Sequence, residues 1–426
     1  MSSWVNWAGD QSCVPAEIAT PTSVDDVVGI VRRAAESGRR IRVAGAGHSF
    51  TDAVLTDGIL VSLDQLDRLL DVDADTGLVR VQAGISLRRL SELMHVHGLA
   101  FPNLGDIDVQ SIAGATATAT HGTGARLQNL SAALHSVEIV TGNGELVELR
   151  ADADPQAWRA ARVSIGALGI VTAVTIAAVP SFVLHADESR MPVAAVLDDL
   201  DTHLADNEHF EFFLFPHARD ALVKRNNRTT ATERPSRAAR ATSYLTQNIG
   251  LDAVARVGRA RPTLIPRLNR TVTALLNNEV RIDRSYRVFA SPRKIKFTEM
   301  EYALPREHGV EALRRIIEVS ERFDTPLPIE ARWVAADDAY LSPAHGRDTC
   351  YIAVHMYRGM PWEPYFRAAE SIFDDYGGRP HWGKRHTQTA ATLAARYPEW
   401  DRFAAVRDRL DPARLFTNAY VERVLG

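Results

Sequence analysis

Apolar and polar positions in the first 180 residues alternate between helical and strand spacing. Apolar residues at helical spacing after Ser23, which suits an N-cap, predict a helix that ends at Gly38. A second helix is predicted over 86–97, and strands are predicted at 41–44, 78–82, 134–141, 145–149 and 169–179. The Asn143-Gly144 pair between two of these strands indicates a hairpin. We therefore expect residues 1–180 to form one α+β domain.

After Pro180 the pattern changes to longer strands and arginine-rich helices. Strands are predicted at 210–215, 294–304, 328–334 and 349–357, and a helix is predicted at 307–323. We expect residues 181–370 to form a second α+β domain. From about Trp362 the pattern is helical, and residues 371–426 are expected to form a C-terminal segment that returns to the first domain. The 426 residues suffice for two or three domains with large hydrophobic cores.

The composition is that of an ordinary globular protein, with 46% hydrophobic and 24% charged residues. The first residues show no basic stretch followed by an apolar run, and no run of about 18 apolar residues occurs. We expect neither a signal peptide nor a membrane span, and hence a cytoplasmic protein. The two cysteines, Cys13 and Cys350, are too few for a disulfide framework or a thiolate cage, and no metal is expected.

Charge is distributed unevenly along the chain. The stretch 225–296, called the basic segment below, has 16 Lys and Arg against four acidic residues, a net +12 in a chain of net −4. This pattern is typical of a solvated helical surface, and the alternative is weak peripheral attraction to an anionic lipid surface or an acidic redox partner. The segment's only aromatics are Tyr244, Tyr286 and Phe289, which is too few for stacking along a nucleic acid, and none is expected to bind.

A glycine turn follows the strand predicted at 41–44. Gly45-Ala46-Gly47-His48-Ser49 lacks the third glycine of the Rossmann dinucleotide fingerprint, because Phe50 stands in its place. The turn's backbone N–H groups can still form a nest for a pyrophosphate. A plain turn from strand to loop explains the two glycines equally well.

A second segment, 111–124, consists almost entirely of small side chains. Glycine and alanine let the backbone approach a ligand closely, and the threonine hydroxyls can bind its heteroatoms. The segment therefore favours contact with something large and flat. The alternative is a tightly packed turn between sheets.

Two predicted strands place polar side chains on one face. Glu330 and Arg332 are two residues apart and so share a side, as do His355 and Tyr357 on the next strand. From the residues alone, the first pair is typical of a structural or surface ion pair. A single histidine on a strand is more often a satisfied core residue.

These motifs together resemble the flavoprotein family of vanillyl-alcohol oxidase. The resemblance rests on 44–50, 113–124 and His381-Trp382-Gly383-Lys384, and it covers the chain from about Trp7 to Leu425. Within the family the sequence is similar to the sugar-lactone branch, which holds L-gulono-1,4-lactone oxidases and dehydrogenases, arabinonolactone oxidase and alditol oxidase. The stretches 297–302 and 379–384 resemble the actinobacterial L-gulono-1,4-lactone dehydrogenases.

The resemblance implies a two-domain FAD-binding fold with an α+β cap domain over the isoalloxazine ring. It implies a pyrophosphate loop at Ala44, Gly45, Ala46, Gly47, His48 and Ser49, with His48 bonded covalently to the flavin 8α-methyl carbon. A neutral imidazole nitrogen is a competent nucleophile for that bond. The other cofactor positions that it implies are Gly114, Ala115, Thr118, Thr120, His121, Gly122, Gly124, Gly169, Ile170 and His381.

The resemblance also implies the activity and its residues. Glu330 and Arg332 would contact the substrate over the flavin, with His355 beside them, and the Lys384 cation would stabilise the negative charge that hydride transfer to N5 develops. The implied reaction is oxidation of a carbinol of an aldonolactone of the L-gulono-1,4-lactone type. The implied alternative is an alditol oxidase that forms hydrogen peroxide. The sequence leaves open the sugar, the oligomeric state and whether oxygen or a redox carrier accepts the electrons.

Two other classes compete on the residues alone. One is a glycan hydrolase with a carboxylate pair drawn from Glu299, Glu301 and Glu330, which would be colourless. The other is a flavin-binding carrier without catalysis, whose flavin no sugar would reduce.

Overall fold

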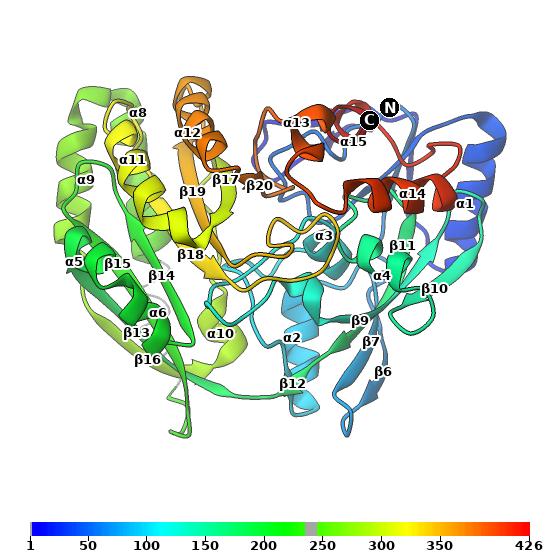
Figure 1. Ribbon diagram of the computed structural model, residues 1–426, viewed down its shortest axis with the longest axis horizontal. Helices are drawn as coiled ribbons and strands as arrows, with labels where there is room; N and C mark the ends of the chain where they lie inside the picture. The colour runs from blue at the N-terminus through cyan, green and yellow to red at the C-terminus, as the bar shows by residue number, and fades with distance from the viewer. Residues whose placement is uncertain (1, 235–244) are drawn as a thin grey trace.

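The computed structural model describes residues 2–234 and 245–426, and Figure 1 shows two halves, each built around β-sheet. Part of the basic segment, including Tyr244, lies outside the described residues. The first half, on the right, holds α1 at its outer edge and also the C-terminal helices α13 to α15. The second half, on the left, holds the largest sheet. The chain crosses between the halves at β12 (Val179–Pro180).

The predicted first helix and the hairpin are confirmed. Helix α1 (Val24–Ser37) begins where the Ser23 side chain accepts a hydrogen bond from the Asp26 amide, and it ends at Gly38 in the left-handed conformation (φ 64°). It packs against a parallel sheet of order β3-β5-β4, formed by Glu17–Ala19, Ile59–Ser62 and Ile41–Ala44.

A five-stranded antiparallel sheet completes the first half. Its order is β10-β9-β11-β7-β6, formed by Leu146–Arg150, Leu134–Val140, Ile170–Ala177, Leu78–Gln82 and Leu69–Asp73. Helices α2 (Leu87–Val96) and α4 (Pro155–Arg162) share its core with buried aromatic residues of the C-terminal segment, namely Trp382, Tyr397, Phe403 and Tyr420. The end of the chain is therefore part of the first hydrophobic core. The domain boundaries at 180 and 370 stay a prediction.

The second half is an eight-stranded antiparallel sheet. Its order is β16-β13-β15-β14-β18-β19-β17-β20, formed by Glu279–Arg284, Val183–Pro192, Asp220–Thr229, His209–Leu214, Ile329–Val334, Thr349–Tyr357, Phe297–Pro305 and Arg379–Pro380. The apolar residues on one face pack under helices α5, α6, α11 and α12, formed by Val193–Asp198, Leu200–Asp206, Gly309–Ser320 and Glu363–Asp375. The other face turns toward the first half.

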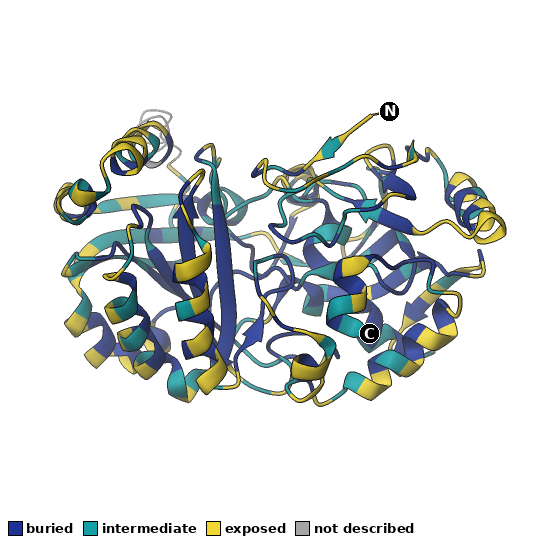
Figure 2. Cartoon of the chain, turned by 90° about the horizontal axis from the view of Figure 1, so that it is seen from above, coloured by how far each residue is buried: buried dark blue, intermediate teal, exposed yellow. Residues whose placement is uncertain are grey.

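Strands β18 and β19 are buried along their whole length, as the dark blue strands of Figure 2 illustrate. Both faces of these strands are therefore covered, one by helices and one by the first half. This burial explains why polar side chains on the second face are enclosed rather than solvated.

The C-terminal segment is less helical than its pattern predicts. Helices α13 (Ala390–Ala394), α14 (Trp400–Leu410) and α15 (Ala419–Leu425) form, but His381 to Lys384 lie in an irregular stretch after β20. Backbone bonds fix this stretch, because the Phe50 amide donates to the Gly383 carbonyl (2.8 Å). The other α-helices and strands of the described residues are β1 (Trp4–Val5), β2 (Ser12–Cys13), β8 (Leu99–Ala100), α3 (Ile112–Ala117), α8 (Leu251–Ala260), α9 (Ile265–Ala274) and α10 (Ser285–Phe289), and a π-helical segment, Leu245–Gly250, precedes α8.

Within 2–234 and 245–426, the structure has no helix of the length and hydropathy needed to cross a membrane.

A substitution at Gly58 tests how tightly the parallel sheet is packed. A methyl group there would overlap the Arg40 carbonyl oxygen, so Gly58→Ala is expected to destabilise the protein by about 2 kcal/mol or more. Gly29→Ala is the matched control, since its methyl group would meet only the flexible Arg33 side chain at 3.5 Å and alanine favours the helix. The midpoint of urea unfolding should fall for the first variant and hold or rise for the second. Equal midpoints would contradict the packing.

Candidate active site

Two cavities meet at His48. The first, called the trough below, is lined mainly by small residues of the glycine turn, of α3 and of 164–169. The second, called the charged pocket, lies between the two halves and is lined by acidic, basic and histidine side chains. His48, Ser49, Gln110 and Thr118 line both cavities, so the two form one elongated site.

The residues of the trough fit the pyrophosphate and adenosine parts of FAD. A methyl group on Gly45 would lie 2.6 Å from the Ser111 hydroxyl oxygen, and Gly47 has φ 69°, so the turn depends on both glycines. Within the described chain, none of the amides of Ala46, Gly47, His48 and Ser49 donates to a protein acceptor. Four successive free N–H groups beside small side chains suit an anionic pyrophosphate.

The structure brings most of the expected cofactor residues to this site. Those in the trough are Ala44, Gly45, Ala46, Gly47, His48, Ser49, Gly114, Thr118 and Gly169. Those in the charged pocket are Thr120, His121 and His381.

Four of the expected cofactor residues line neither cavity, and their contact with the cofactor stays a prediction. Ala115 and Ile170 are fully buried in two apolar cores of the first half. Gly122 is small because a side chain there would overlap Asn103 and the Leu104 carbonyl, and Gly124 lies against Glu208 and Leu127. These residues are packed against protein, not against the space where a ligand fits.

His48 is held unprotonated at the junction. Burial lowers its pKa to about 4, and the nearby Lys296 and Lys384 add to the effect. Its ring stacks on Trp7, with 5.0 Å between centroids and 23° between planes. The Lys296 ammonium group lies 4.0 Å from the centre of the Trp7 ring and donates to its carbonyl oxygen at 2.5 Å. The imidazole is therefore neutral and fixed in orientation.

One face of the large sheet forms the floor of the charged pocket. Alternation along β18 places Glu330 and Arg332 in the pocket and Ile329, Ala331 and Trp333 in the core below, so the predicted shared face is confirmed. The same alternation along β17 places Glu299 and Glu301 in the pocket. Sequence reasoning had considered these two glutamates only as acids of a hydrolase, although strand spacing could have found them.

Arg332 lies among three carboxyl groups, of which those of Glu211 and Glu330 are buried and that of Asp106 is partly exposed. Its Nη2 is 2.7 Å from Asp106 Oδ1, its Nε is 2.8 Å from Glu211 Oε2, and it also pairs with Glu330. Burial acts to raise the pKa of Asp106, but Arg332 and two other cations outweigh it and hold that pKa far below its usual range.

Glu330 behaves in the opposite way. Burial raises the pKa of Glu330 to about 8, because Arg332 only partly offsets the loss of water and the neighbouring carboxylates add to the shift. Near neutral pH this carboxyl group is therefore protonated and can donate a hydrogen bond into the pocket.

Lys384 and His355 meet at Glu299. The Lys384 ammonium group donates to Glu299 Oε2, and the carboxylates Glu299 and Glu301 raise the pKa of Lys384 against the effect of burial. His355 Nδ1 lies 2.8 Å from the Pro328 carbonyl, an acceptor, so the ring proton is on Nδ1 and Nε2 keeps its lone pair. Burial lowers the pKa of His355, which leaves Nε2 free to accept a proton.

Tyr357 does not complete the wall with His355, as the strand period had suggested. Its side chain packs in the second core and its hydroxyl donates to Asp252 at 2.8 Å, because α8 covers this end of β19.

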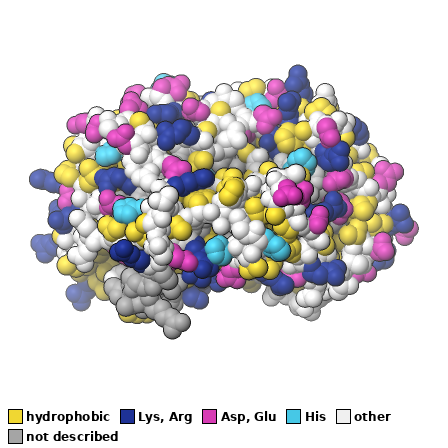
Figure 3. Space-filling view, turned by 90° about the horizontal axis from the view of Figure 1, so that it is seen from below, with side chains coloured by type: hydrophobic (Ala, Val, Ile, Leu, Met, Phe, Trp, Pro, Cys, Tyr) yellow, Lys and Arg dark blue, Asp and Glu magenta, His cyan; other side chains and the backbone are white. Residues whose placement is uncertain are grey.

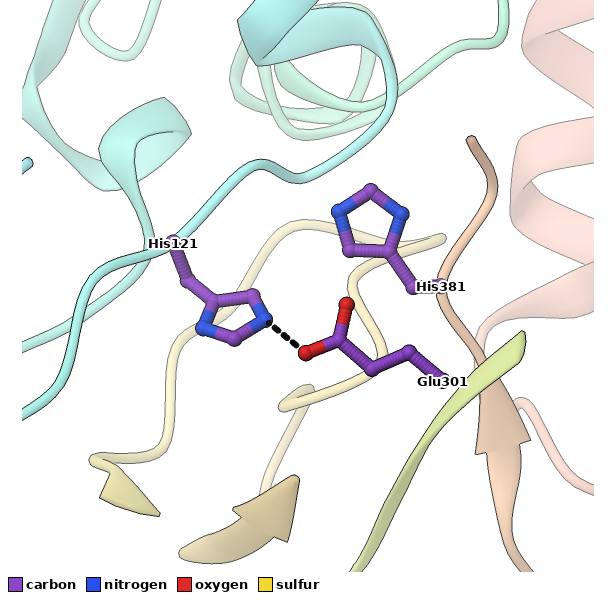
Figure 4. Close-up of side chains that lie close together, drawn as sticks. All are labelled: His121, Glu301 and His381. Atoms are coloured by element: carbon purple, nitrogen blue, oxygen red, sulfur yellow. Dashed lines mark ion pairs between the residues drawn. The ribbon is translucent and has the colours of Figure 1, made fainter. Parts of the chain in front are cut away.

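A buried cluster of His121, Glu301 and His381 lies in the pocket, with their ligand atoms within 4.8 Å of one another (Figure 4). His381 Nδ1 accepts from the Gly383 amide at 3.0 Å, which places its proton on Nε2 and leaves no lone pair there for a metal. His121 Nε2 is 3.2 Å from Glu301, and its Nδ1 faces the Gly122 carbonyl. Each histidine of the cluster therefore has one ring nitrogen hydrogen-bonded to the backbone.

A dinucleotide trough that opens into a charged pocket beneath a large antiparallel sheet defines an FAD-dependent oxidoreductase of the vanillyl-alcohol oxidase type. Residues 15–150 match the model described as FAD binding domain, and residues 174–424 match the model described as D-arabinono-1,4-lactone oxidase. The chain belongs to the D-arabinono-1,4-lactone oxidase family.

Relatives and solved structures agree with this assignment. The chain is 51% identical to an L-gulono-1,4-lactone dehydrogenase of Mycobacterium tuberculosis, with 99% of each chain covered. It is 34% identical to an L-gulonolactone oxidase of Bos taurus and 32% identical to an alditol oxidase of a Streptomyces species, each over 97% or more of both chains. A cholesterol oxidase structure from B. sterolicum shares the fold, with a TM-score of 0.85 at 18% identity over 100% of this chain and 96% of that one. The predicted family, fold class and FAD cofactor are confirmed.

The raised pKa of Glu330 predicts a pH effect on stability. Between its unfolded pKa near 4.3 and its folded pKa of about 8, the native state binds a proton that the unfolded state has released. The free energy of unfolding should therefore fall as the pH rises through this window, by at most about 1.4 kcal/mol per pH unit. Glu330→Gln, which mimics the protonated acid, should lose this dependence. Urea unfolding of both proteins at pH 5.5 and 8 measures it, and parallel pH dependences would contradict it.

Proposed function

We propose that the protein oxidises a carbinol of an aldonolactone of the L-gulono-1,4-lactone type. The observation that carries the proposal is the grouping of Glu330, Arg332, His355 and Lys384 in one buried pocket at the end of a dinucleotide trough. Relatives that match over the whole chain are named for gulonolactone, which supports this substrate class. FAD, when bound, supplies the acceptor for the hydride.

The carbinol proton is accepted by His355 Nε2 in this proposal. The Pro328 carbonyl fixes the Nδ1 proton, so the free lone pair lies on the nitrogen that faces Glu299 at 3.7 Å. Glu330 is mostly protonated below pH 8 and is therefore a poor base at neutral pH. It donates to a substrate oxygen instead.

Arg332 and Lys384 supply positive charge from fixed positions. Asp106 and Glu211 hold the guanidinium group of Arg332, which stays oriented toward substrate oxygens without reorganisation. Lys384 is held by Glu299 close to the His48 end of the pocket, where it stabilises negative charge that develops during the reaction. The two cations thus act on different ends of the site.

Alditol oxidation is the second candidate. The pocket offers the carboxyl group of Glu330, the guanidinium group of Arg332 and the imidazole of His355, groups that bind the hydroxyls of an open polyol as well as those of a lactone. A relative named alditol oxidase matches over 99% of this chain. In either case oxygen or a redox carrier takes up the electrons.

Anaerobic mixing of the purified flavoprotein with a panel of aldonolactones and alditols tests the proposal. L-Gulono-1,4-lactone is expected to bleach the flavin absorbance in a single turnover, faster than its open-chain alditol. Faster bleaching by alditols would favour the second candidate. Bleaching by neither class would overturn both.

Two variants test the assigned residues in the same experiment. Lys384→Met removes the cation and His355→Gln removes the base, and each is expected to slow bleaching about 100-fold at saturating substrate. His135→Gln is the matched control, because His135 is exposed on β9 and lines neither cavity. Wild-type rates in both pocket variants would show that their ion pairs serve only the structure.

We further propose that His48 is bonded covalently to the flavin. Its neutral ring, its stacking on Trp7 and its position between trough and pocket support this role. Acid precipitation should leave a yellow pellet for the wild type, whereas His48→Ala should release the colour into the supernatant. A colourless wild-type pellet would disprove the bond while leaving FAD binding intact.

A further inference from the structure

Exposed apolar side chains gather on one edge of the second half. Five of the twelve strongly exposed large hydrophobic residues of the described chain fall within 245–280, and they are Leu245, Ile249, Val257, Leu275 and Val280. Leu275 is 71% exposed and Ile249 is 57% exposed. This stretch includes α8 and α9, which stand side by side at the outer end of the large sheet (Figure 1).

Leu245, Ile249 and Val257 are all exposed on a continuous helical stretch, 245–260, which begins with a π-helical segment and continues as α8, and these three residues are called the stripe below. Ala255 and Gly258 on the opposite side are buried against the sheet domain. A helix whose solvent side carries the larger apolar residues is unusual in a protein surface.

Cationic side chains are exposed on α9 and at the end of α8. Arg261, Arg267 and Arg270 are exposed and, within the described residues, have no carboxylate partner. By contrast, Asp252 on α8 is already paired with Arg256 at 2.7 Å. On the face of the molecule seen in Figure 3, Lys and Arg side chains are mixed with Asp and Glu side chains.

The same helices adjoin the charged pocket. Leu251, the first residue of α8, lines the pocket together with Arg293 and Ile295. The side chain of Asn248 accepts from the Lys294 amide at 2.7 Å, which fixes the helix to this wall. The apolar and cationic surface is therefore the outer side of a wall of the pocket.

We propose that α8 and α9 dock the protein on an anionic lipid bilayer. Leu245, Ile249, Val257 and Leu275 enter the region between headgroups and acyl chains, and Arg261, Arg267 and Arg270 contact anionic headgroups. The apolar stripe suits the acyl chains of such a bilayer, and the unpaired arginines suit its anionic headgroups. This inference does not depend on which sugar the protein oxidises.

Other occupants fit the surface less well. A second copy of the chain in a symmetric contact would bring the same unpaired arginines together, which is repulsive. A nucleic acid would use the arginines but not the apolar stripe, and α8 and α9 contain no aromatic residue for stacking.

Cosedimentation of the FAD-loaded protein with vesicles tests the proposal. Binding is expected to vesicles of phosphatidylglycerol and phosphatidylcholine in low salt, and it should weaken strongly in 0.5 M salt. The double variant Arg267→Gln/Arg270→Gln is expected to bind about 30-fold more weakly, because each basic residue near the surface contributes about fivefold in affinity. Ile249→Ser should weaken binding without changing its salt dependence.

Matched controls come from the first half. Arg32→Gln/Arg39→Gln removes two exposed charges, and Val96→Ser replaces a residue that is 79% exposed. Both should bind like the wild type. Equal binding to vesicles of phosphatidylcholine alone, or equal losses in the controls, would overturn the proposal. A dimer in solution that Ile249→Ser dissociates, without vesicle binding, would replace it with self-association.

Discussion

The buried guanidinium group of Arg332 is the interaction on which the rest of the site depends. Its partners come from separate parts of the chain: Asp106 from a loop of the first half, and Glu211 and Glu330 from the large sheet. A guanidinium removed from water is stable only when carboxylates surround it closely. Ion pairs of Arg332 therefore connect the two halves at the same place where the substrate is expected to bind.

The carboxyl groups around this one guanidinium group do not all have the same pKa, because each ionised carboxylate makes it harder to ionise the next. Asp106, which Arg293 also contacts at 2.8 Å, keeps its charge, and Glu330 takes the proton near neutral pH. The arrangement thus separates two roles that the sequence treats alike: carboxylates that hold the arginine and a carboxyl group that donates a hydrogen bond. Their spacing along the chain carries no sign of this difference.

Strand alternation made part of the site predictable. It placed Glu330 and Arg332 on one face, and the same rule applied to β17 would have found Glu299 and Glu301. Asp106 gave no such signal, because it lies in an irregular loop whose position is set by tertiary contacts. Tyr357 shows the limit of this rule. Alternation tells which side of a strand a side chain is on, but it does not tell whether a helix such as α8 covers that part of the strand.

Segments of small residues were a weaker guide to the site than the alternation of side chains along a strand. Gly45 and Gly122 belong to equally small-residue segments, but one lines the trough and the other lies against the Leu104 carbonyl. Both environments exclude a side chain, so composition cannot distinguish a bound ligand from neighbouring backbone. Only the three-dimensional structure shows which side of each segment is protein.

The junction at His48 connects the neutral trough with the charged pocket. Lys384, which Glu299 holds at the pocket wall, also lowers the pKa of His48 together with Lys296. A cation that stabilises developing negative charge also keeps a neighbouring imidazole neutral. Lys384 therefore both assists the proposed reaction and keeps His48 unprotonated. Glu299 therefore acts on both through Lys384, although it touches neither the trough nor the His48 ring in the described contacts.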